Sequence, residues 1–405
     1  MPPGVDAGAV LDPGLPGPWP VGYGTVRVAD PRRPGRVLVT SVWYPARPSS
    51  TSTAGLGARE LPRTISLRRS PPAPRKVPAA ALVDAGVGDG GACPEMTVGG
   101  PRGAAGQPAF YPLVGKIGLT SASAVTDAEP APGPFALVVF SHGSAGSRVQ
   151  ASYLMEALAS HGYVVVAPDH PGDTMMDVAD GHTEAPVDMA IDRSRDVSAV
   201  LDALTAPTCT VAPLVRPDQI AVVGFSFGGL TSVLASEGLA SSGHVWVPAD
   251  PRVRASVGLA PAISPLPPEL LAGVAVPTLL IGAGADPAVP VDANVDRPFG
   301  LLTASHPVIT AVLGGATHNS FSEVCRQYGL LNDRGIPARL RLRVAVTAAA
   351  TCWPPYLDPG TAHLLTTRTV VAFLDWQLRG QSGYRTLLAP GVRGSGPTMT
   401  LRARP

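Results

Sequence analysis

Residues 219–229 read QIAVVGFSFGG and decide the fold that we expect for this chain. The apolar run 220–223 predicts a buried strand, and the apolar residues in 230–235 predict a helix soon after it. The pentapeptide GFSFG between them predicts a sharp turn with Ser226 at its apex. Only very small residues fit beside such a strained turn, which exposes the serine hydroxyl at the end of a sheet. A glycine-rich loop with an incidental serine is the alternative, and the pentapeptide alone does not exclude it.

The size and charge of the chain bound its class. It has 405 residues, 45% of them hydrophobic, and a net charge of +1. This length suits one large domain or two ordinary ones. The small net charge does not indicate binding to nucleic acid or to an anionic membrane. No apolar run approaches the roughly 18 residues that span a bilayer. The first 20 residues lack a signal peptide's basic and apolar regions, so we expect an intracellular protein or one whose leader has been removed.

From residue 134 onward, apolar β-type runs alternate with helical patterns. The expected strands are 135–140, 163–167, 220–223, 253–259, 278–281 and 308–313, and the expected helices are 150–160, 189–204, 291–302 and 362–378. This alternation predicts an α/β fold with a mostly parallel central sheet and helices on both faces. The segments 22–29 and 36–43 predict an antiparallel N-terminal hairpin at an edge of that sheet.

Residues 48–133 differ in composition from the rest of the chain. They are rich in Pro, Gly and Ser, which predicts an insertion with little regular structure. The run 86–91 matches G-x-G-x-x-G, but no strand–turn–helix frame surrounds it, so it carries little weight as a nucleotide site. We therefore expect a single domain with a core of 21–47 and 134–390, interrupted by this insertion.

The chain contains four cysteines, Cys93, Cys209, Cys325 and Cys352, which allow three pairings if all are bridged. None lies in a C-x-x-C spacing, so we expect no zinc site. Cys325 and Cys352 are closest in sequence and are the disulfide candidate. Closing their loop would stabilise the fold by about 3 kcal/mol in the chain-entropy model. Four buried thiols remain the alternative.

Further loops after expected strands carry groups that can assist a serine. The loop 141–146, SHGSAG, can present a backbone N–H to a developing oxyanion, and the N–H of Phe227 would be a second donor. Asp286 follows the fifth expected strand, where an acid can orient a histidine and stabilise its imidazolium. Asp292 and Asp296 compete with it, but they fall in an expected helix and are interpreted as solvated.

His318 lies in the glycine-bearing turn 314–321, which suits a general base aimed at a serine. His142 and His170 also fall at strand ends and are its rivals. The other histidines fall in expected helices or connecting loops. The loop 167–172, which contains His170, predicts no specific chemical role.

Taken together, these segments resemble the α/β-hydrolase superfamily, and within it the platelet-activating-factor-acetylhydrolase-like and dienelactone-hydrolase-related esterases. Bacterial cutinases and polyester hydrolases are similar in their core. The matching pieces are GPWPVGYGTVRVAD, VWYPA, VVFSHGSAG, LASHGYVVVAPDHPG, DVSAVLDAL, VVGFSFGG, DPRVRASVGLAPA, VPTLLIGAGAD, GATHNSF and VVAFLDWQLRG. They cover most of residues 17–47 and 134–380. The order Ser226, Asp286, His318 matches the superfamily's triad, whereas both rival histidines precede the serine.

The resemblance implies a serine hydrolase of carboxylic esters. Ser226 would be the nucleophile, Asp286 the acid and His318 the base, and the N–H groups of Ser144 and Phe227 would form the oxyanion hole. The implied substrate is a small-molecule or lipid-like ester, and no metal or organic cofactor is implied.

Three departures from the family bear on the substrate. Phe225 stands where many relatives have histidine or tryptophan, and Ala262 stands where polyester hydrolases carry a substrate-clamping tryptophan. Both are candidate substrate-binding residues. The insertion 48–133 has no counterpart and could narrow or cover the pocket. A serine nucleophile argues against dienelactone hydrolysis. A lipase, phospholipase or cutinase-like polyester hydrolase, or a non-catalytic binding protein of the same fold, remain the alternatives.

Overall fold

The structure is a computed structural model that describes residues 10–48, 106–182, 184–241, 243–333, 335–391 and 398–405. Contacts within the chain define two compact units. The smaller one, Pro48–Ala92, falls almost entirely outside the described residues. The larger one, Met1–Arg47 with Cys93–Pro405, contains all the elements below.

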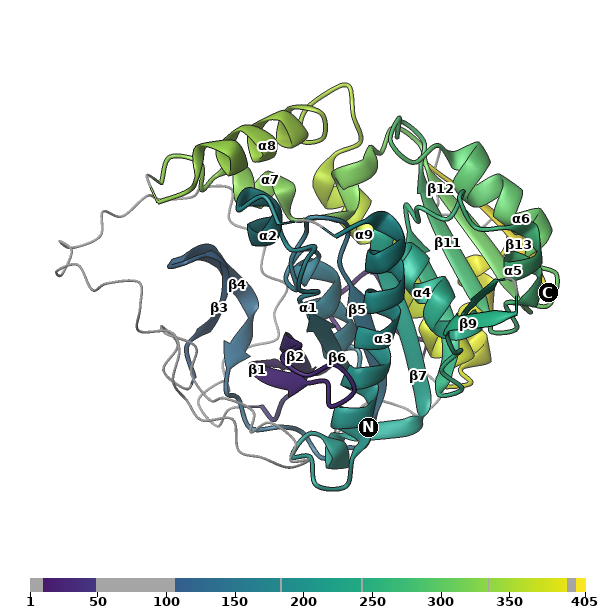
Figure 1. Cartoon of the computed structure of the whole chain (residues 1–405), viewed down its shortest axis with the longest axis horizontal. Coiled ribbons are helices and arrows are strands. Elements are labelled where there is room, and N and C mark those ends of the chain that lie inside the picture. The colour runs from purple at the N-terminus through teal and green to yellow at the C-terminus, as the bar shows by residue number, and fades with distance from the viewer. Residues whose placement is uncertain (1–9, 49–105, 183, 242, 334, 392–397) are drawn as a thin grey trace, which may run out of the picture. The chain divides into compact units, whose positions relative to one another are not determined.

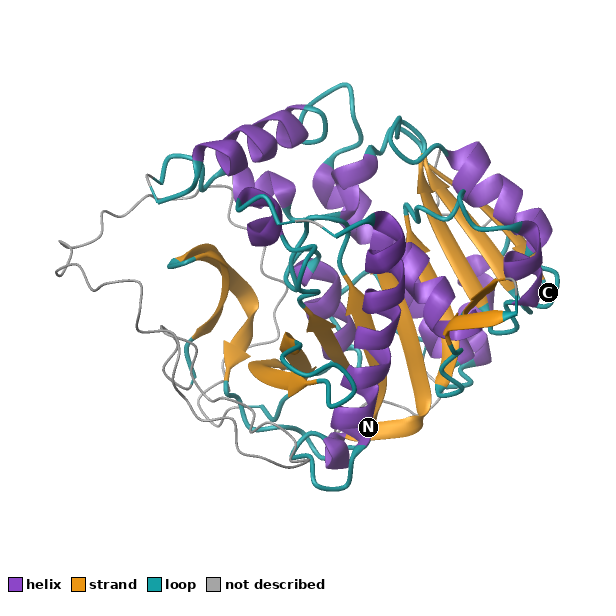
Figure 2. Cartoon of the chain, in the orientation of Figure 1, coloured by secondary structure: helices purple, strands orange, loops and turns teal. Residues whose placement is uncertain are grey.

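A mixed sheet of eleven strands forms the centre of the larger unit as far as it is described (Figure 2). In chain order the strands of the structure are β1 (Val21–Ala29), β2 (Val37–Pro45), β3 (Pro108–Val114), β4 (Ile117–Thr126), β5 (Phe135–Ser141), β6 (Tyr163–Pro168), β7 (Val215–Phe225), β8 (Leu239–Ser241), β9 (His244–Val247), β10 (Val253–Leu259), β11 (Thr278–Ala283), β12 (Val308–Leu313) and β13 (Met399–Arg404). The sheet order is β13-β12-β11-β10-β7-β5-β6-β2-β1-β4-β3, and β8 pairs with β9 separately. The six strands from β12 to β6 are all parallel, which confirms the predicted α/β class.

The N-terminal hairpin is present, but its predicted position at a sheet edge is wrong. β1 and β2 pair antiparallel along their whole length. β2 also pairs with β6, and β1 also pairs with β4, so both strands lie inside the sheet. Two further strands, β4 and β3, continue the sheet beyond the hairpin.

The expectation of little regular structure over 48–133 is wrong for residues 108–126, which form β3 and β4. β4 reads IGLTSASAVT, and its buried positions include Ser121 and Ala124 as well as Leu119. Small and polar residues at inward positions hide the alternation from which a strand is predicted. Residues 49–105, with the glycine run 86–91, lie outside the described residues.

Helices cover both faces of the sheet (Figure 1). The α-helices of the described residues are α1 (Ser152–Ser160), α2 (Met175–Ala179), α3 (Pro186–Thr205), α4 (Phe227–Glu237), α5 (Pro268–Gly273), α6 (Arg297–Leu301), α7 (Val324–Tyr328), α8 (Ala338–Ala349) and α9 (Pro359–Gln377). Alternate side chains of β5 show the layering. Val138 and Phe140 pack with α1 and α9, whereas Leu137 and Val139 pack with α3 on the other face. Among the described helices, none has the length and apolarity to cross a bilayer.

Several element boundaries follow from local chemistry. β10 and β12 have the predicted bounds. The expected helix 291–302 is instead a π-helical turn, Asp292–Asp296, followed by α6, in which Pro298 lacks the backbone N–H of a regular turn. α9 begins at Pro359, three residues before the predicted start, because the Asp358 carboxylate caps it by accepting the Thr361 N–H at 2.8 Å. Shorter 3₁₀ turns cover Ala212–Leu214, His318–Phe321 and Ser382–Leu388.

Candidate active site

The turn between β7 and α4 holds Ser226 in a strained conformation. Its φ is 55° and its ψ is −116°, a region that residues with a Cβ rarely adopt. Neighbouring glycines make the turn possible. A Cβ on Gly224 would stand 1.9 Å from the Gly228 oxygen, and a Cβ on Gly228 would stand 1.9 Å from the Ser141 oxygen. The sequence GFSFG therefore places the hydroxyl of Ser226 at the carboxyl edge of the sheet.

His318 joins Ser226 to Asp286. Its Nε2 lies 2.9 Å from Ser226 Oγ, and its Nδ1 lies 2.6 Å from Asp286 Oδ2. Since a carboxylate only accepts, Nδ1 carries the proton and Nε2 is free to accept the serine proton. The Asp286 side chain is buried, and its other oxygen accepts the N–H groups of Ala288 and Val289 at 2.8 and 3.0 Å. These bonds fix the carboxylate that orients the imidazole.

The loops that carry Asp286 and His318 are tied directly to each other. The Ala285 N–H donates to the Ala316 oxygen at 2.8 Å. The ring of Phe225 lies 4.9 Å from the imidazole, centroid to centroid, and is almost fully buried. The three side chains therefore come from strand ends that are held in a fixed relation.

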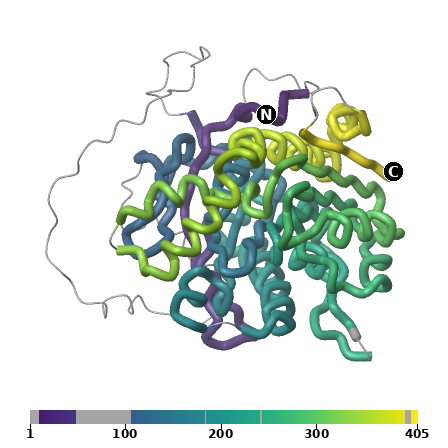
Figure 3. The backbone as a smooth tube through the Cα atoms, turned by 90° about the horizontal axis from the view of Figure 1, so that it is seen from above, coloured from purple at the N-terminus to yellow at the C-terminus, as the bar shows by residue number. Residues whose placement is uncertain are grey.

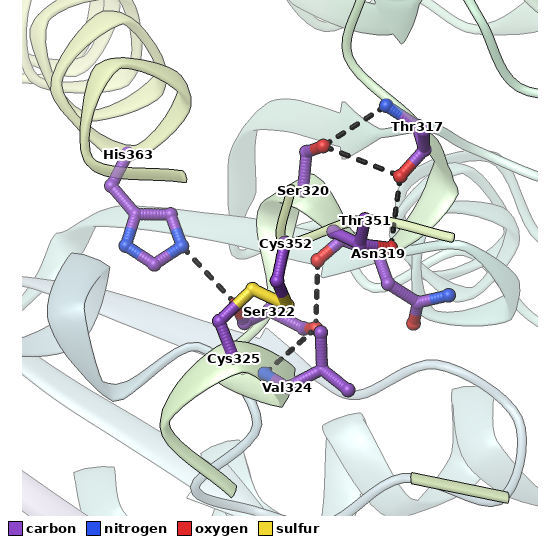
Figure 4. The surroundings of a disulfide bond; sticks show 9 residues. All are labelled: Thr317, Asn319, Ser320, Ser322, Val324, Cys325, Thr351, Cys352 and His363. Carbon is purple, nitrogen blue, oxygen red and sulfur yellow. Dashed lines mark hydrogen bonds between the residues drawn. A yellow bond between two sulfur atoms is a disulfide. The ribbon is translucent and has the colours of Figure 1, made fainter. Parts of the chain in front are cut away.

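A disulfide supports the His318 loop from behind. Cys325 and Cys352 are bonded to each other, and Figure 4 shows them beside the 3₁₀ turn that begins at His318. Thr351, next to Cys352, accepts a hydrogen bond from Thr317 Oγ1 at 3.0 Å. The bridge thereby links α7, which follows the histidine turn, to the segment after α8.

A cavity of about 280 Å³ opens over Ser226 and His318. Its lining comes from the loop after β5, from α2, and from α7 and α8: Gly143, Ser144, Ala145, Gly146, Ser147, Gln150, Met175, Phe225, Ser226, His318, Asn319, Ser322, Val324, Gln327, Arg343, Val344 and Thr347. Both views place α7 and α8 beside α2, above the carboxyl ends of the strands (Figure 1; Figure 3, yellow-green). Of the two candidate substrate-binding residues, Phe225 lines this cavity and Ala262 does not.

An apolar groove adjoins this cavity and shares Met175, Gln327 and Val344 with it. Its other walls come from the β3–β4 hairpin, from α7 and from the segment leading into α8: Leu113, Val114, Ile117, Leu330, Leu331, Ile336 and Leu340. The described end of the sequence insertion thus contributes to the surroundings of the site. Sequence reasoning missed this, because it predicted no strands there.

The loop after β5 is shaped by a buried carboxylate. Asp173 Oδ1 accepts the Ala145 N–H and the Ser144 hydroxyl, both at 2.9 Å. These bonds hold Ala145 at a φ of 53°. The Gly143 N–H donates to Gln150 Oε1 at 2.7 Å, whereas the Ser144 N–H has no acceptor among the described residues. Phe227 opens α4, and the first N–H groups of a helix have no partner within it.

Arg193 lies behind this loop and is 1% exposed. Its guanidinium forms an ion pair with Asp173 and donates to the backbone oxygens of His142 and Gly143. It also stacks over the Phe227 ring at 5.1 Å. Burial lowers the pKa of Arg193, and the Asp173 charge opposes that effect. One buried cation therefore contacts both segments that carry the candidate oxyanion donors.

The rival histidines belong to a separate buried network. His142 and His170 are 0% exposed, and desolvation lowers the pKa of each ring. Ser141 Oγ donates to His170 Nε2 at 3.0 Å, and His170 Nδ1 donates to Asp196 at 2.8 Å. Arg36 and Arg33, from the β1–β2 turn, also donate to Asp196. No cavity described here reaches these groups, so they pack the N-terminal hairpin against the core.

The competing acids Asp292 and Asp296 are both exposed, as expected from the sequence.

The sheet order, the strained serine turn and the loops at the strand ends define the α/β-hydrolase fold. Comparisons with known proteins agree with the resemblance seen in the sequence. A family model described as platelet-activating factor acetylhydrolase, isoform II, matches residues 106–179. The solved ferulic acid esterase from Streptomyces cinnamoneus is 24% identical, with a TM-score of 0.59 over 94% of this chain and 96% of that one.

Two cutinases are similar to part of the chain. Cutinase est1 of Thermobifida alba is 28% identical over 190 residues, 45% of this chain and 53% of that protein. Cutinase 2 of Thermobifida cellulosilytica is also 28% identical over 190 residues, which are 60% of its own length. The chain thus spans little more than half the length of the curated relatives it matches.

Proposed function

We propose that this chain is a serine hydrolase that cleaves carboxylic esters through an acyl-enzyme. The observation that carries the proposal is the hydrogen-bonded series from Ser226 Oγ through His318 to the buried Asp286, at 2.9 and 2.6 Å. It lies at the base of a cavity, so a substrate can reach it. The names of the similar proteins, cutinases and an esterase, support the same reaction class.

In the first half of the reaction, Ser226 Oγ attacks the acyl carbonyl carbon while its proton moves to His318 Nε2. The negative charge on the carbonyl oxygen is stabilised by the N–H groups of Ser144 and Phe227. Removing one such donor typically costs about 3 kcal/mol of transition-state stabilisation. The tetrahedral intermediate then breaks its bond to the alcohol oxygen, which takes the proton from His318 and leaves.

In the second half, His318 accepts a proton from water, and the resulting hydroxide attacks the acyl-enzyme carbonyl. Ser226 Oγ leaves and recovers its proton from His318. The products are one carboxylic acid and one alcohol, and the protein returns to its starting state. Asp286 keeps the imidazole in the productive tautomer and stabilises its charged form.

The cavity dimensions support a small ester as the substrate. About 280 Å³ lies at the small end of the ~300–1,000 Å³ typical of ligand pockets. The adjoining apolar groove adds only about 20 Å³, which is room for about one water-sized group. We therefore expect 4-nitrophenyl esters of short acids to be cleaved faster than those of long fatty acids. The reverse profile would favour the lipase alternative.

The test is covalent labelling with a fluorophosphonate probe, followed by 4-nitrophenyl butyrate hydrolysis. Wild-type protein should be labelled and active, and Ser226→Ala should be unlabelled and inactive with an unchanged thermal unfolding profile. Ser382→Ala, at an exposed serine far along the chain, is the matched control and should behave like wild type. Absence of labelling in folded wild-type protein would favour a non-catalytic binding protein instead.

A further inference from the structure

The cavity over Ser226 carries one permanent charge, and that charge is positive. Apart from His318, Arg343 is the sole ionisable side chain among the described residues that line it. The rest of the lining is backbone, neutral polar groups and a few apolar side chains. A substrate that enters therefore meets a cation without meeting a carboxylate.

Arg343 is fixed in place by α8. Leu340, one turn earlier, is buried, and Val344 and Thr347 line the cavity with it. Residues spaced by three and four positions share one helix face, so this face of α8 forms a wall of the site. The Cys325–Cys352 bridge ties the end of the segment that contains α8 to α7.

The guanidinium has donor capacity to spare. Its recorded hydrogen bond runs from Nη2 to the Ser144 oxygen at 3.4 Å, which is long for an N–H···O bond. Within the described part of the chain, no carboxylate forms an ion pair with it. Asp173 acts on it only at longer range, because that carboxylate is occupied by Arg193 and by the Ser144–Ala145 segment.

Surrounding protein atoms lower the pKa of Arg343, and the Asp173 charge only partly offsets this. A guanidinium nevertheless keeps its charge at any working pH. Arg343 is a solvent-exposed residue that lines the cavity, and its planar guanidinium fork matches a carboxylate in two parallel bonds.

We propose that Arg343 binds an anionic group of the substrate, so that the enzyme prefers esters that carry a carboxylate or a similar anion. This inference rests on the proposed ester hydrolysis. Arg343 contacts the backbone oxygen of Ser144, whose N–H is the proposed oxyanion donor. An anion bound by Arg343 would therefore lie in the same cavity as the reacting carbonyl, where one small substrate can carry both groups.

The test compares two esters that share a six-carbon acyl chain and a leaving group, mono-4-nitrophenyl adipate and 4-nitrophenyl hexanoate. A second pair, 4-carboxyphenyl and phenyl hexanoate, places the carboxylate on the alcohol side. In Arg343→Gln we expect kcat/KM to fall about five- to tenfold for at least one anionic ester, mainly through KM, and to stay within twofold for its neutral partner. The preference should also weaken at high salt.

Arg339→Gln is the matched control, because it removes an exposed arginine from the same helix outside the cavity. It should leave every ratio unchanged. Arg343→Lys keeps the charge without the fork and should retain part of the preference. An equal loss for the charged and neutral members of both pairs would overturn the proposal, and so would no loss at all.

A binding measurement separates this inference from the proposed reaction. Ser226→Ala is titrated calorimetrically with monomethyl adipate and with methyl hexanoate, with and without Arg343→Gln. Tighter binding of the adipate that depends on Arg343 supports the anion site even if no ester is hydrolysed. Equal binding of the two esters in both variants refutes it, whatever the turnover assay shows.

Discussion

The Asp173–Arg193 pair allows a quantitative test of how the proposed oxyanion loop is held. Asp173→Asn preserves the size of the side chain and an oxygen that can still accept from Ala145 and the Ser144 hydroxyl. It removes the negative charge opposite Arg193, whose guanidinium is 1% exposed. Breaking a buried pair by removing one partner typically costs about 3–5 kcal/mol, because an uncompensated charge stays inside.

The expected cost lies at the lower end of that range. Asp196 and Glu184 also favour the charged guanidinium, and two backbone oxygens continue to accept from it. We therefore expect Asp173→Asn to lower the free energy of unfolding by about 3 kcal/mol. The same change loosens the loop that presents the Ser144 N–H, so kcat for 4-nitrophenyl butyrate should fall about tenfold or more, with a smaller change in KM.

Urea denaturation gives the stability and steady-state kinetics gives the activity. The double variant Asp173→Asn/Arg193→Met removes the stranded charge and should be less destabilised than the sum of the single variants. Its kcat should stay low, because the loop still lacks its clamp. A cost below about 1 kcal/mol for Asp173→Asn, or strictly additive single variants, would refute the reasoning.

Three further predictions concern the histidine orienter, acid stability and the disulfide. Asp286→Asn should lower kcat about 10⁴-fold, because an amide no longer fixes the imidazole tautomer. The variant should stay folded but lose its labelling by the fluorophosphonate probe. Labelling and kcat at wild-type levels would argue against Asp286 as the orienting acid. Desolvation lowers the pKa of four largely buried histidines: His142, His161, His170 and His363. Below pH about 6.5 the unfolded chain protonates these imidazoles, whereas the folded chain keeps them neutral. The urea midpoint should therefore be highest above pH 6.5 and should fall toward pH 5. A midpoint that does not change over that pH range would contradict buried neutral rings. Cys325→Ser/Cys352→Ser should lower the free energy of unfolding by about 3 to 4 kcal/mol and reduce kcat, because the bridge closes the segment between α7 and the end of α8. Cys209 is also disulfide-bonded, so reduced wild-type protein should lose at least as much stability as this variant. An unchanged free energy of unfolding in the variant would contradict a structural bridge.

The sequence predicts the fold well where the apolar pattern is continuous. The runs 220–223, 253–259 and 308–313 are buried on both faces with Arg254 as the one exposed position, and each is a strand in the structure. The pattern fails where inward positions are small or polar, as in β4 with Ser121, or where a strand is remote from its partner in sequence. β13 pairs with β12 from the C-terminal end of the chain, and short-range periodicity carries no signal for such a pairing.

The candidate site follows a similar division. An expected parallel strand precedes each of Ser226, Asp286 and His318. Because parallel strands end at one edge of a sheet, the sequence predicts that these side chains lie close together. The role of α8 could not be predicted, since nothing in its sequence says which cavity Arg343 lines. Likewise, Asp173 and Arg193 are ordinary charged residues in the sequence, and only the fold shows that both are buried behind the oxyanion loop.

The described residues contain two Ser–His–Asp series with nearly the same distances, and comparing them shows what makes one of them a candidate for catalysis. Ser141, His170 and Asp196 are joined at 3.0 and 2.8 Å, much like the series that begins at Ser226. Yet Ser141 ends a regular strand and is 0% exposed, and the Asp196 carboxylate is shared with two arginines that attract its charge away from the imidazole. Ser226 instead projects from a strained turn into a cavity, near the Ser144 N–H, for which the described residues supply no acceptor. Hydrogen-bond geometry alone would select both series. Access for an ester and donors for its oxyanion favour the series that begins at Ser226.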